Sequence, residues 1–87
     1  MKIKFITQNV CAGCGALETF LKNEHADIDI ETINIDKDTD AVEKYGIMAT
    51  PTTILWDVEF DEEVTRHIGF IAGEDEDFID ELIDFAQ

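Results

Sequence analysis

The sequence predicts an α/β domain in which a four-stranded mixed β-sheet is flanked by three helices, in the order β-α-β-α-β-β-α. Two strand patterns enclose a stretch with helical spacing, which predicts a βαβ unit with parallel strands and a right-handed crossover. Two further strand patterns are joined by a short connection and must run antiparallel. An amphipathic helix follows them. The length of 87 residues suits a single domain over residues 1–87, with helices on both faces of the sheet.

The first half of the chain carries the predicted βαβ unit. A buried strand is expected over Lys2–Thr7, and a helix from Cys11 to about Asn23. The next strand is expected over Ile28–Ile35. Its alternation slips at Thr32, so either a β-bulge lies there or the regular strand begins late.

A short helix is expected between the second and third strands. Asp38 or Thr39 is suited to its N-cap, because short polar side chains accept hydrogen bonds from the first helical N–H groups. The helix would run through Tyr45 and end at Gly46, since glycine readily adopts the left-handed conformation that follows a helix.

The last three elements are two strands and a helix. Strands are expected over Thr52–Trp56 and Val64–Ile68. The segment between them has no Asn-Gly or Asp-Gly signal, so the type of hairpin turn is not defined. The carboxylates of Glu74–Asp77 suit the first turn of the last helix, where the helix dipole favours negative charge. The expected apolar stripe of this helix consists of Phe78, Ile79, Leu82, Ile83 and Ala86.

The chain is strongly acidic, with 21 acidic and 6 basic residues and a formal net charge of −15. This charge argues against binding to nucleic acid or to an anionic membrane surface. Solvated charges that keep the protein soluble are the simplest explanation, and a basic partner surface or a salt-rich cytoplasm are the alternatives. No apolar run approaches the roughly 20 residues of a membrane span. The N-terminus shows no secretory signal pattern, so we expect a cytoplasmic protein.

The two cysteines, Cys11 and Cys14, enclose Ala12 and Gly13 at the point where a strand ends and a helix begins. A close pair in a cytoplasmic chain indicates redox or metal chemistry. The N–H groups and partial positive charge of a helix N-terminus stabilise a thiolate, so we expect the pKa of Cys11 to lie below the free value of about 8.5. Cys11 would then attack a target disulfide, and Cys14 would resolve the mixed disulfide.

A metal site is the alternative explanation of the cysteine pair. Structural zinc takes four ligands, and the remaining candidates, His25 and His67, are isolated from each other and from the cysteines in the sequence. We therefore expect no metal and no cofactor. The sequence identifies no partner for either histidine. We expect His25 to be solvated after the first helix, and Trp56 to pack on the sheet.

A second group of motifs follows in the order Ile33–Asp36, Lys44–Ile47, Thr50–Thr52 and Ile54–Leu55, with Gly69 after the fourth strand. Together with the cysteine pair, these motifs resemble thioredoxins over nearly the whole chain. The chain lacks the extra N-terminal strand and helix of thioredoxins. In this respect it is closer to glutaredoxins and to the small redoxins that supply electrons to ribonucleotide reductase.

The resemblance implies the thioredoxin fold, a cis bond before Pro51, and a position of this proline against the cysteine pair. The backbone at Thr50 would then be free to pair with an extended substrate segment. The residues expected to contact the substrate are Ala12, Gly13, Thr50, Pro51 and Gly69. The alternative is that Pro51 only begins an edge strand.

Three positions depart from the thioredoxin pattern. Val10 stands in place of the tryptophan before the first cysteine, and Ala12-Gly13 stands in place of Gly-Pro. Lys2–Thr7 contains no acidic residue, whereas thioredoxins carry a buried aspartate on this strand. The proton acceptor of the resolving step is therefore not given by the resemblance.

The resemblance implies a monomeric protein disulfide reductase. It would take electrons from a flavoprotein of the thioredoxin-reductase type and pass them to target disulfides, with ribonucleotide reductase as a possible acceptor. A glutathione-dependent glutaredoxin is the first alternative, and a non-catalytic adaptor or metal-binding module is the second. Gln8-Asn9 and Gly69-Phe70 depart from the glutaredoxin pattern of a lysine region and a glycine pair. We therefore expect poor binding of glutathione, which is anionic.

Overall fold

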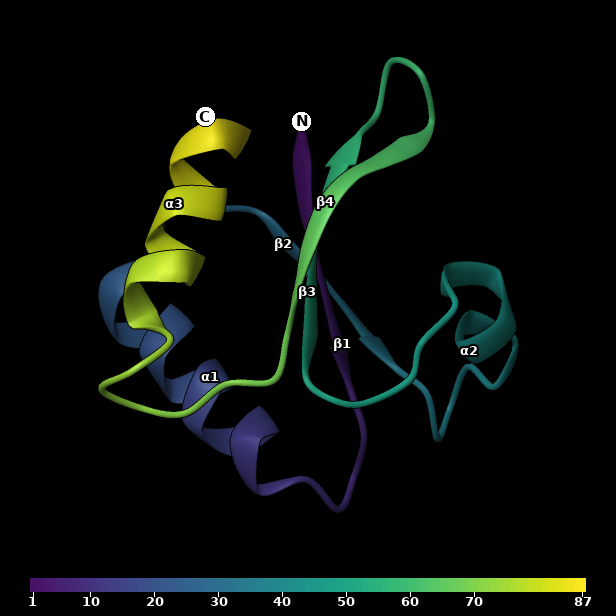
Figure 1. Cartoon of the computed structure of the whole chain (residues 1–87), viewed down its shortest axis with the longest axis horizontal. Coiled ribbons are helices and arrows are strands. Elements are labelled where there is room, and N and C mark those ends of the chain that lie inside the picture. The colour runs from purple at the N-terminus through teal and green to yellow at the C-terminus, as the bar shows by residue number, and fades with distance from the viewer.

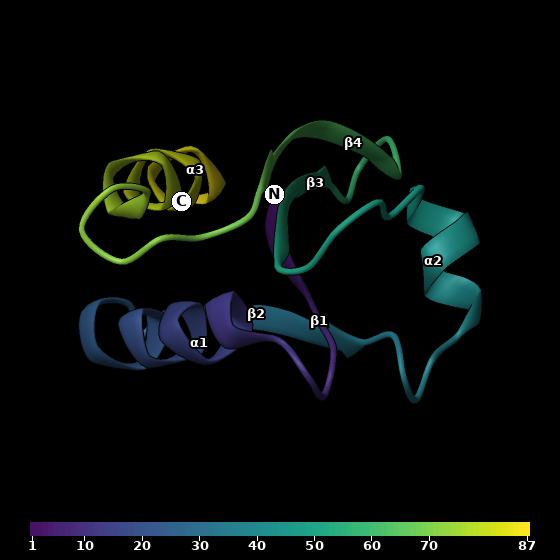
Figure 2. The same ribbon diagram turned by 60° about the horizontal axis from the view of Figure 1, so that its bottom comes forward.

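In the computed structural model, which describes residues 1–87, one sheet separates helices α1 and α3 from helix α2 (Figure 1, Figure 2). The strand order is β2-β1-β3-β4. This arrangement confirms the predicted fold class and element order. None of the helices is long and apolar enough to cross a membrane. The elements are β1 (Lys2–Thr7), α1 (Ala12–Glu24), β2 (Ile30–Asn34), α2 (Asp40–Tyr45), β3 (Thr52–Asp57), β4 (Glu62–Ile68) and α3 (Glu76–Ala86).

The sheet is mixed, as predicted. β1 is parallel to β2 and antiparallel to β3, and β3 is antiparallel to β4. The pairing of β1 with β2 is continuous from Ile3↔Ile30 to Thr7↔Asn34, so the slip in the sequence pattern reflects a late strand start and not a bulge. Ile28 lies before the strand, where it packs against the core. The only register shift in the sheet lies between Leu55 and Trp56, where β3 pairs with β4.

Two apolar clusters hold the layers together. The larger one joins the sheet to α1 and α3, and it includes Phe5, Cys14 and Phe70. The smaller one joins the sheet to α2 through Ile6, Ile33, Ala41, Tyr45 and Ile54. Because Cys14 belongs to the larger cluster, the core reaches directly to the sulfur pair.

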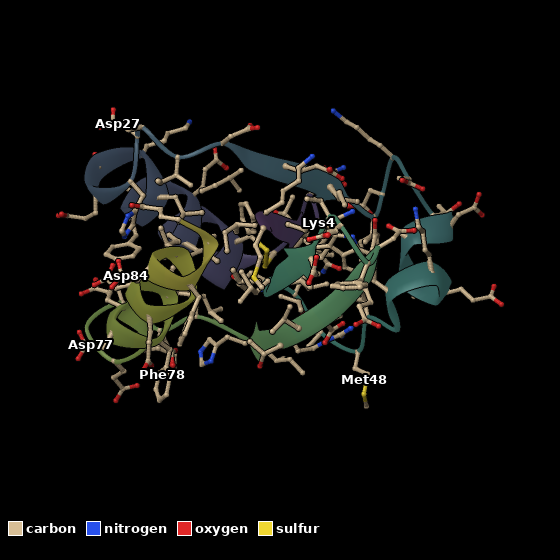
Figure 3. The ribbon with its side chains drawn as sticks, turned by 90° about the horizontal axis from the view of Figure 1, so that it is seen from above. Lys4, Asp27, Met48, Asp77, Phe78 and Asp84 are labelled. Carbon is tan, nitrogen blue, oxygen red and sulfur yellow. A yellow bond between two sulfur atoms is a disulfide. The ribbon has the colours of Figure 1, made fainter.

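Helices α1 and α3 lie side by side on one face of the sheet (Figure 2). His25 forms the C-cap of α1, and its Nε2 lies 2.6 Å from Oδ1 of Asp80 on α3. The expectation that His25 is solvated was therefore wrong, because its side chain is only 16% exposed. Phe78 was also wrongly placed in the apolar stripe of α3, because its side chain points outward and is 55% exposed (Figure 3). The face of α3 that meets the sheet is narrower than the sequence pattern suggested and consists chiefly of Ile79, Leu82 and Ile83.

Helix α2 is held against the opposite face of the sheet by a buried lysine. Nζ of Lys4 donates a hydrogen bond of 2.9 Å to the Tyr45 hydroxyl and lies 4.5 Å from the centre of the Trp56 ring. The predicted sheet packing of Trp56 is confirmed, with its ring also edge-on to Tyr45. Gly46 ends the helix in the left-handed conformation at φ 61°, as predicted. Thr39 occupies the N-cap position, but no side chain caps this helix.

Arg66 on β4 connects the end of α2 to the sheet edge. Its guanidinium donates hydrogen bonds to the backbone carbonyls of Tyr45 and Gly46 and to the carboxylate of Glu63. The hydrogen bond and charge of Arg66 hold the pKa of Glu63 below its ordinary value of 4.5. The segment after α2 leads to Pro51, so Arg66 helps to fix the start of the segment that reaches the cysteine pair.

Replacing Glu63 with glutamine should lower stability in a pH-dependent way. Because the pKa of Glu63 is lower in the folded state, the pair stabilises the fold above pH 4.5 and loses its effect as the pH falls through the lowered value. We expect a loss of up to about 1 kcal/mol at neutral pH, since solvent screens the pair. Urea unfolding at neutral and acidic pH measures this. The exposed Glu62→Gln is the matched control, and an equal loss in both variants would contradict the expectation.

The two glycines in the first turns of α1 should respond differently to alanine. A Cβ at Gly15 would meet nothing within 4 Å, whereas a Cβ at Gly13 would lie 3.1 Å from both the Phe70 carbonyl oxygen and Cδ of Pro51. Gly15→Ala should raise the free energy of unfolding by about 1 kcal/mol, the helix preference of alanine. Gly13→Ala should gain less or lose stability. Equal gains in urea unfolding would show that the crowding at Gly13 has no energetic effect.

Candidate active site

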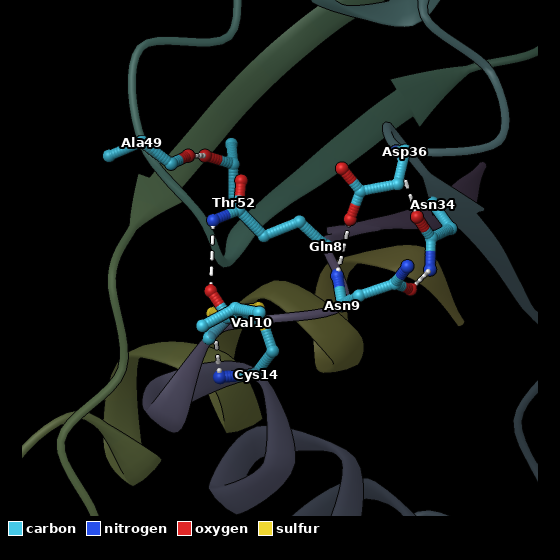
Figure 4. The surroundings of a disulfide bond; sticks show 9 residues. Gln8, Asn9, Val10, Cys14, Asn34, Asp36, Ala49 and Thr52 are labelled. Atoms are coloured by element: carbon cyan, nitrogen blue, oxygen red, sulfur yellow. Dashed lines mark hydrogen bonds between the residues drawn. A yellow bond between two sulfur atoms is a disulfide. The ribbon is translucent and has the colours of Figure 1, made fainter.

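The cysteine pair lies at the junction of β1 and α1, and the structure shows it as a disulfide between Cys11 and Cys14 (Figure 4). The two Cα atoms are 5.3 Å apart. Cys11 is the N-cap residue of α1, and its Sγ accepts a hydrogen bond of 3.1 Å from the backbone N–H of Cys14. Cys11 is half-buried, whereas Cys14 is only 4% exposed. An incoming group therefore reaches the Cys11 sulfur first.

The surroundings of Cys14 are apolar. Phe5, Leu17 and Phe70 belong to the same buried cluster, and no carboxylate is buried anywhere in the structure. Phe5 comes from β1, the strand on which the sequence shows no acidic residue. The core behind the Cys14 sulfur thus supplies apolar packing and no buried carboxylate.

Pro51 forms the second wall of the site. The Thr50–Pro51 bond is cis, as the resemblance implied, and the ring approaches Gly13 at the start of α1. The turn that contains it is closed by a hydrogen bond of 2.7 Å from the Thr52 hydroxyl to the Ala49 carbonyl. Thr50 itself lies outside the helices and strands and makes no backbone hydrogen bond within the chain.

The loop between β4 and α3 forms the third wall. Gly69 adopts φ 85°, a conformation that side chains disfavour, and its N–H donates a hydrogen bond of 2.7 Å to the Pro51 carbonyl. The next residue, Phe70, is buried, and its carbonyl faces Gly13. Gly13 is therefore the point at which α1, the proline turn and this loop meet.

The segment before Cys11 is fixed by a network of polar side chains (Figure 4). The backbone N–H of Asn9 donates a hydrogen bond of 2.6 Å to the Asp36 carboxylate. The Asn34 amide donates to the Asn9 side chain at 2.9 Å and accepts from the Asp36 N–H at the same distance. Gln8 closes the segment by donating to the Val10 carbonyl at 3.0 Å. The end of β2 and the residues after it thereby position the segment that leads into Cys11.

Large apolar side chains stand exposed on all three loops that border the disulfide. Val10 precedes Cys11, Met48 precedes the proline turn, and Ile71 follows Phe70. Their exposed fractions are 88%, 89% and 61%. Figure 3 shows the Met48 side chain projecting from the body of the molecule. These three residues, here called the apolar rim, place exposed apolar surface on the loops beside the disulfide.

The structure brings together all seven residues that the sequence predicted for the site. Cys11, Ala12, Gly13 and Cys14 open α1, and the predicted substrate-contacting residues Thr50, Pro51 and Gly69 lie on the two neighbouring loops. The contributions of Asn9 and Phe70 were not predicted. Polar residues at both ends of the Ile33–Asp36 motif were the one available signal for the Asn9 contact.

The histidines do not join the cysteines. His25 faces Asp80, and Nε2 of His67 lies 3.2 Å from Oδ1 of Asp75, two partners that the sequence did not identify. The carboxylates come from α3 and the residue before it, which the sequence alone could not place. No group of three or more potential metal-ligating side chains occurs in the structure.

Comparison with known proteins places this geometry in a family. The family model described as thioredoxin domain matches residues 1–83. The chain is similar to the SPbeta prophage-derived thioredoxin-like protein YosR of Bacillus subtilis, with 29% identity over 82 residues that cover 94% of this chain and 99% of that protein.

Solved structures agree with the fold. Thioredoxin 1 of Thermosipho africanus has 26% identity and a TM-score of 0.66, covering 99% of this chain and 98% of its own. Plasmodium falciparum thioredoxin has 16% identity and a TM-score of 0.78, covering 99% and 85%. The chain belongs to the thioredoxin domain family, and its Cys11–Cys14 disulfide at the start of α1 makes it a disulfide oxidoreductase.

Proposed function

We propose that the chain is a protein disulfide reductase, which takes electrons from a flavoprotein of the thioredoxin-reductase type and passes them to disulfides in target proteins. The observation that carries this proposal is the Cys11 sulfur, which is accessible and accepts the Cys14 N–H at the helix N-terminus while Cys14 is buried behind it. Ribonucleotide reductase is the acceptor that the family resemblance suggests.

The reaction proceeds by two thiol–disulfide exchanges. In the reduced chain, the Cys11 thiolate attacks one sulfur of the target disulfide, and the other target sulfur leaves as a thiolate. The Cys14 thiol then loses its proton and attacks the Cys11 sulfur, which releases the second target thiolate. Two electrons have passed to the target, Cys14 has given up one proton, and the chain carries its own disulfide. Since no carboxylate is buried in the structure, the first target thiolate takes this proton.

Target recognition uses the three loops around Gly13. The free backbone groups of Thr50 can pair with an extended segment of the target next to the disulfide. The apolar rim of Val10, Met48 and Ile71 would be covered in that complex. An extended protein segment with apolar side chains fits this surface better than a small polar disulfide does.

A glutathione-linked reaction is the competing function, and the site does not favour it. None of the residues at 8–10, 48–51 and 69–71 is basic, so these three loops offer no cation to the glutathione carboxylates. The net charge of −15 repels the same anion. A reductase activity of this kind suits a monomer in the reducing cytoplasm, where flavoprotein reductases supply electrons.

The two cysteine variants should separate nucleophile from resolver. Cys11→Ser should abolish insulin reduction with dithiothreitol as the electron donor, because the accessible nucleophile is lost. Cys14→Ser should accumulate a mixed disulfide through Cys11, which intact-mass measurement detects. Accumulation by Cys11→Ser in place of Cys14→Ser would reverse the assignment of roles.

The electron donor should be a flavoprotein and not glutathione. We expect insulin reduction when the oxidised chain receives thioredoxin reductase and NADPH, and negligible reduction when it receives glutathione with glutathione reductase, because the three loops beside the disulfide offer the anionic tripeptide no cation. Dithiothreitol is the control donor, since it requires no recognition surface.

Each of the other outcomes would indicate a different donor or a different function. Turnover with glutathione alone would make the chain a glutaredoxin. Activity with dithiothreitol alone would contradict the proposed donor and leave the exchange chemistry intact. No turnover with any donor would exclude the reductase function and favour a non-catalytic adaptor.

A further inference from the structure

Asp75 stands at the N-cap position of α3 but does not cap the helix. No side chain accepts a hydrogen bond from the first N–H groups of α3, although aspartate at this position commonly does so. The Asp75 carboxylate points back instead, and Oδ2 accepts a hydrogen bond of 2.5 Å from the backbone N–H of Ile71. The Asp75 N–H in turn donates to the Ile71 carbonyl at 3.0 Å. The loop is thus closed by two hydrogen bonds between the same pair of residues.

His67 holds the other oxygen of this carboxylate. Its Nε2 lies 3.2 Å from Asp75 Oδ1, and the side chains of His67 and Asp75 are only 22% and 20% exposed. The His67 ring also stacks on Phe78 with 4.9 Å between ring centres. One carboxylate therefore links the end of β4, the loop and the start of α3.

The loop that Asp75 closes is the third wall of the disulfide site. Glycines with positive φ, Gly69 and Gly73, allow its backbone many conformations. It carries Phe70, whose carbonyl faces Gly13, and Ile71, which belongs to the apolar rim. Asp75 is itself fixed to α3, because its carbonyl accepts the Ile79 N–H and Ile79 is fully buried.

We propose that Asp75, held by His67, is a positioning residue that fixes the Gly69–Asp75 loop for the docking of protein disulfides. The inference rests on the proposed reductase function. Asp75 does not touch the sulfurs; it sets the place of Ile71 and of the Phe70 carbonyl beside them. Losing it should therefore weaken reactions with protein disulfides and spare reactions with small disulfides, which need only the Cys11 sulfur.

The test compares two substrates in Asp75→Ala. With insulin and dithiothreitol, the variant should raise KM roughly three- to tenfold, the effect of losing about one hydrogen bond, and leave kcat nearly unchanged. With the small neutral disulfide dithiodipyridine, the reduced variant should react at the wild-type rate, followed by the absorbance of the released thione.

Three matched variants accompany the test. Asp75→Asn keeps an oxygen for the Ile71 N–H and an amide that can donate to neutral His67, so it should restore most of the insulin activity. Asp77→Ala removes the same charge from an exposed residue of the same helix turn and should behave as wild type (Figure 3). His67→Phe retains a ring against Phe78 but loses the bond to Asp75, so it should show an intermediate KM. It also provides the test if Asp75→Ala does not fold.

The outcomes are distinguishable. A raised KM for insulin in Asp75→Ala, with rescue by Asp75→Asn, supports the positioning role. Equal values for Asp75→Ala and Asp77→Ala would overturn it, as would an equal slowing with both substrates, which would indicate general loss of structure. A wild-type chain that reduces neither substrate would refute the proposed function itself, whatever the variants do.

Discussion

The chemistry of this chain depends on the place of one sulfur atom at the start of a helix. Cys11 ends the segment that leaves the central strand β1, and its sulfur accepts a backbone N–H from the first turn of α1. The first N–H groups of a helix have no acceptor within the helix, so the sulfur provides one of them with a hydrogen-bond acceptor. One turn later the helix faces the core, and Cys14 lies there beside Leu17. A single helix start therefore yields an accessible and an inaccessible sulfur.

The remainder of the site is assembled by contact and not by sequence proximity. The proline turn and the loop after β4 both reach Gly13, where a Cβ would lie 3.1 Å from atoms of each. Each neighbouring segment has its own support outside the site. Asp36 supports the residues before Cys11, and Arg66 supports the end of α2 that leads to Pro51. The sulfurs are thus surrounded by segments whose positions are set from behind.

The parts of the structure that local patterns define were predictable. Alternation in β1, helical spacing in α1 and the left-handed residue Gly46 all follow from residues within a few positions of one another. The cysteine pair and the proline turn were found because each belongs to a compact motif. Strand β2 begins only at Ile30. Ile28 packs against the core from outside the strand, so in the sequence pattern it resembles a buried strand residue.

Features that depend on the packing of distant elements were not predictable. His25 and Asp80 are 55 positions apart and meet only because α1 and α3 pack together. In the sequence, Lys4 interrupts the apolar pattern of β1. In the structure, the rings of Tyr45 and Trp56 and the Tyr45 hydroxyl make its burial favourable. In the candidate site, the Asn9–Asp36 contact required the register of β2 beside β1. The sequence alone contains no measure of such distances.

The acidic residues are unevenly distributed over this architecture. Residues 57–87, which include β4 and α3, contain twelve of the 21 acidic residues and one of the six basic ones, and α3 has no cation in its last turn. The electrostatic potential of the molecule is therefore lopsided, with its negative pole on the side of β4 and α3. At low ionic strength, this potential would raise the association rate of a cationic protein and orient it before contact. Added salt removes the effect, because at about 0.1 to 0.15 M it screens charges beyond about 8 to 10 Å. The association rates with natural partners should thus depend on ionic strength, whereas the sulfur chemistry itself should not.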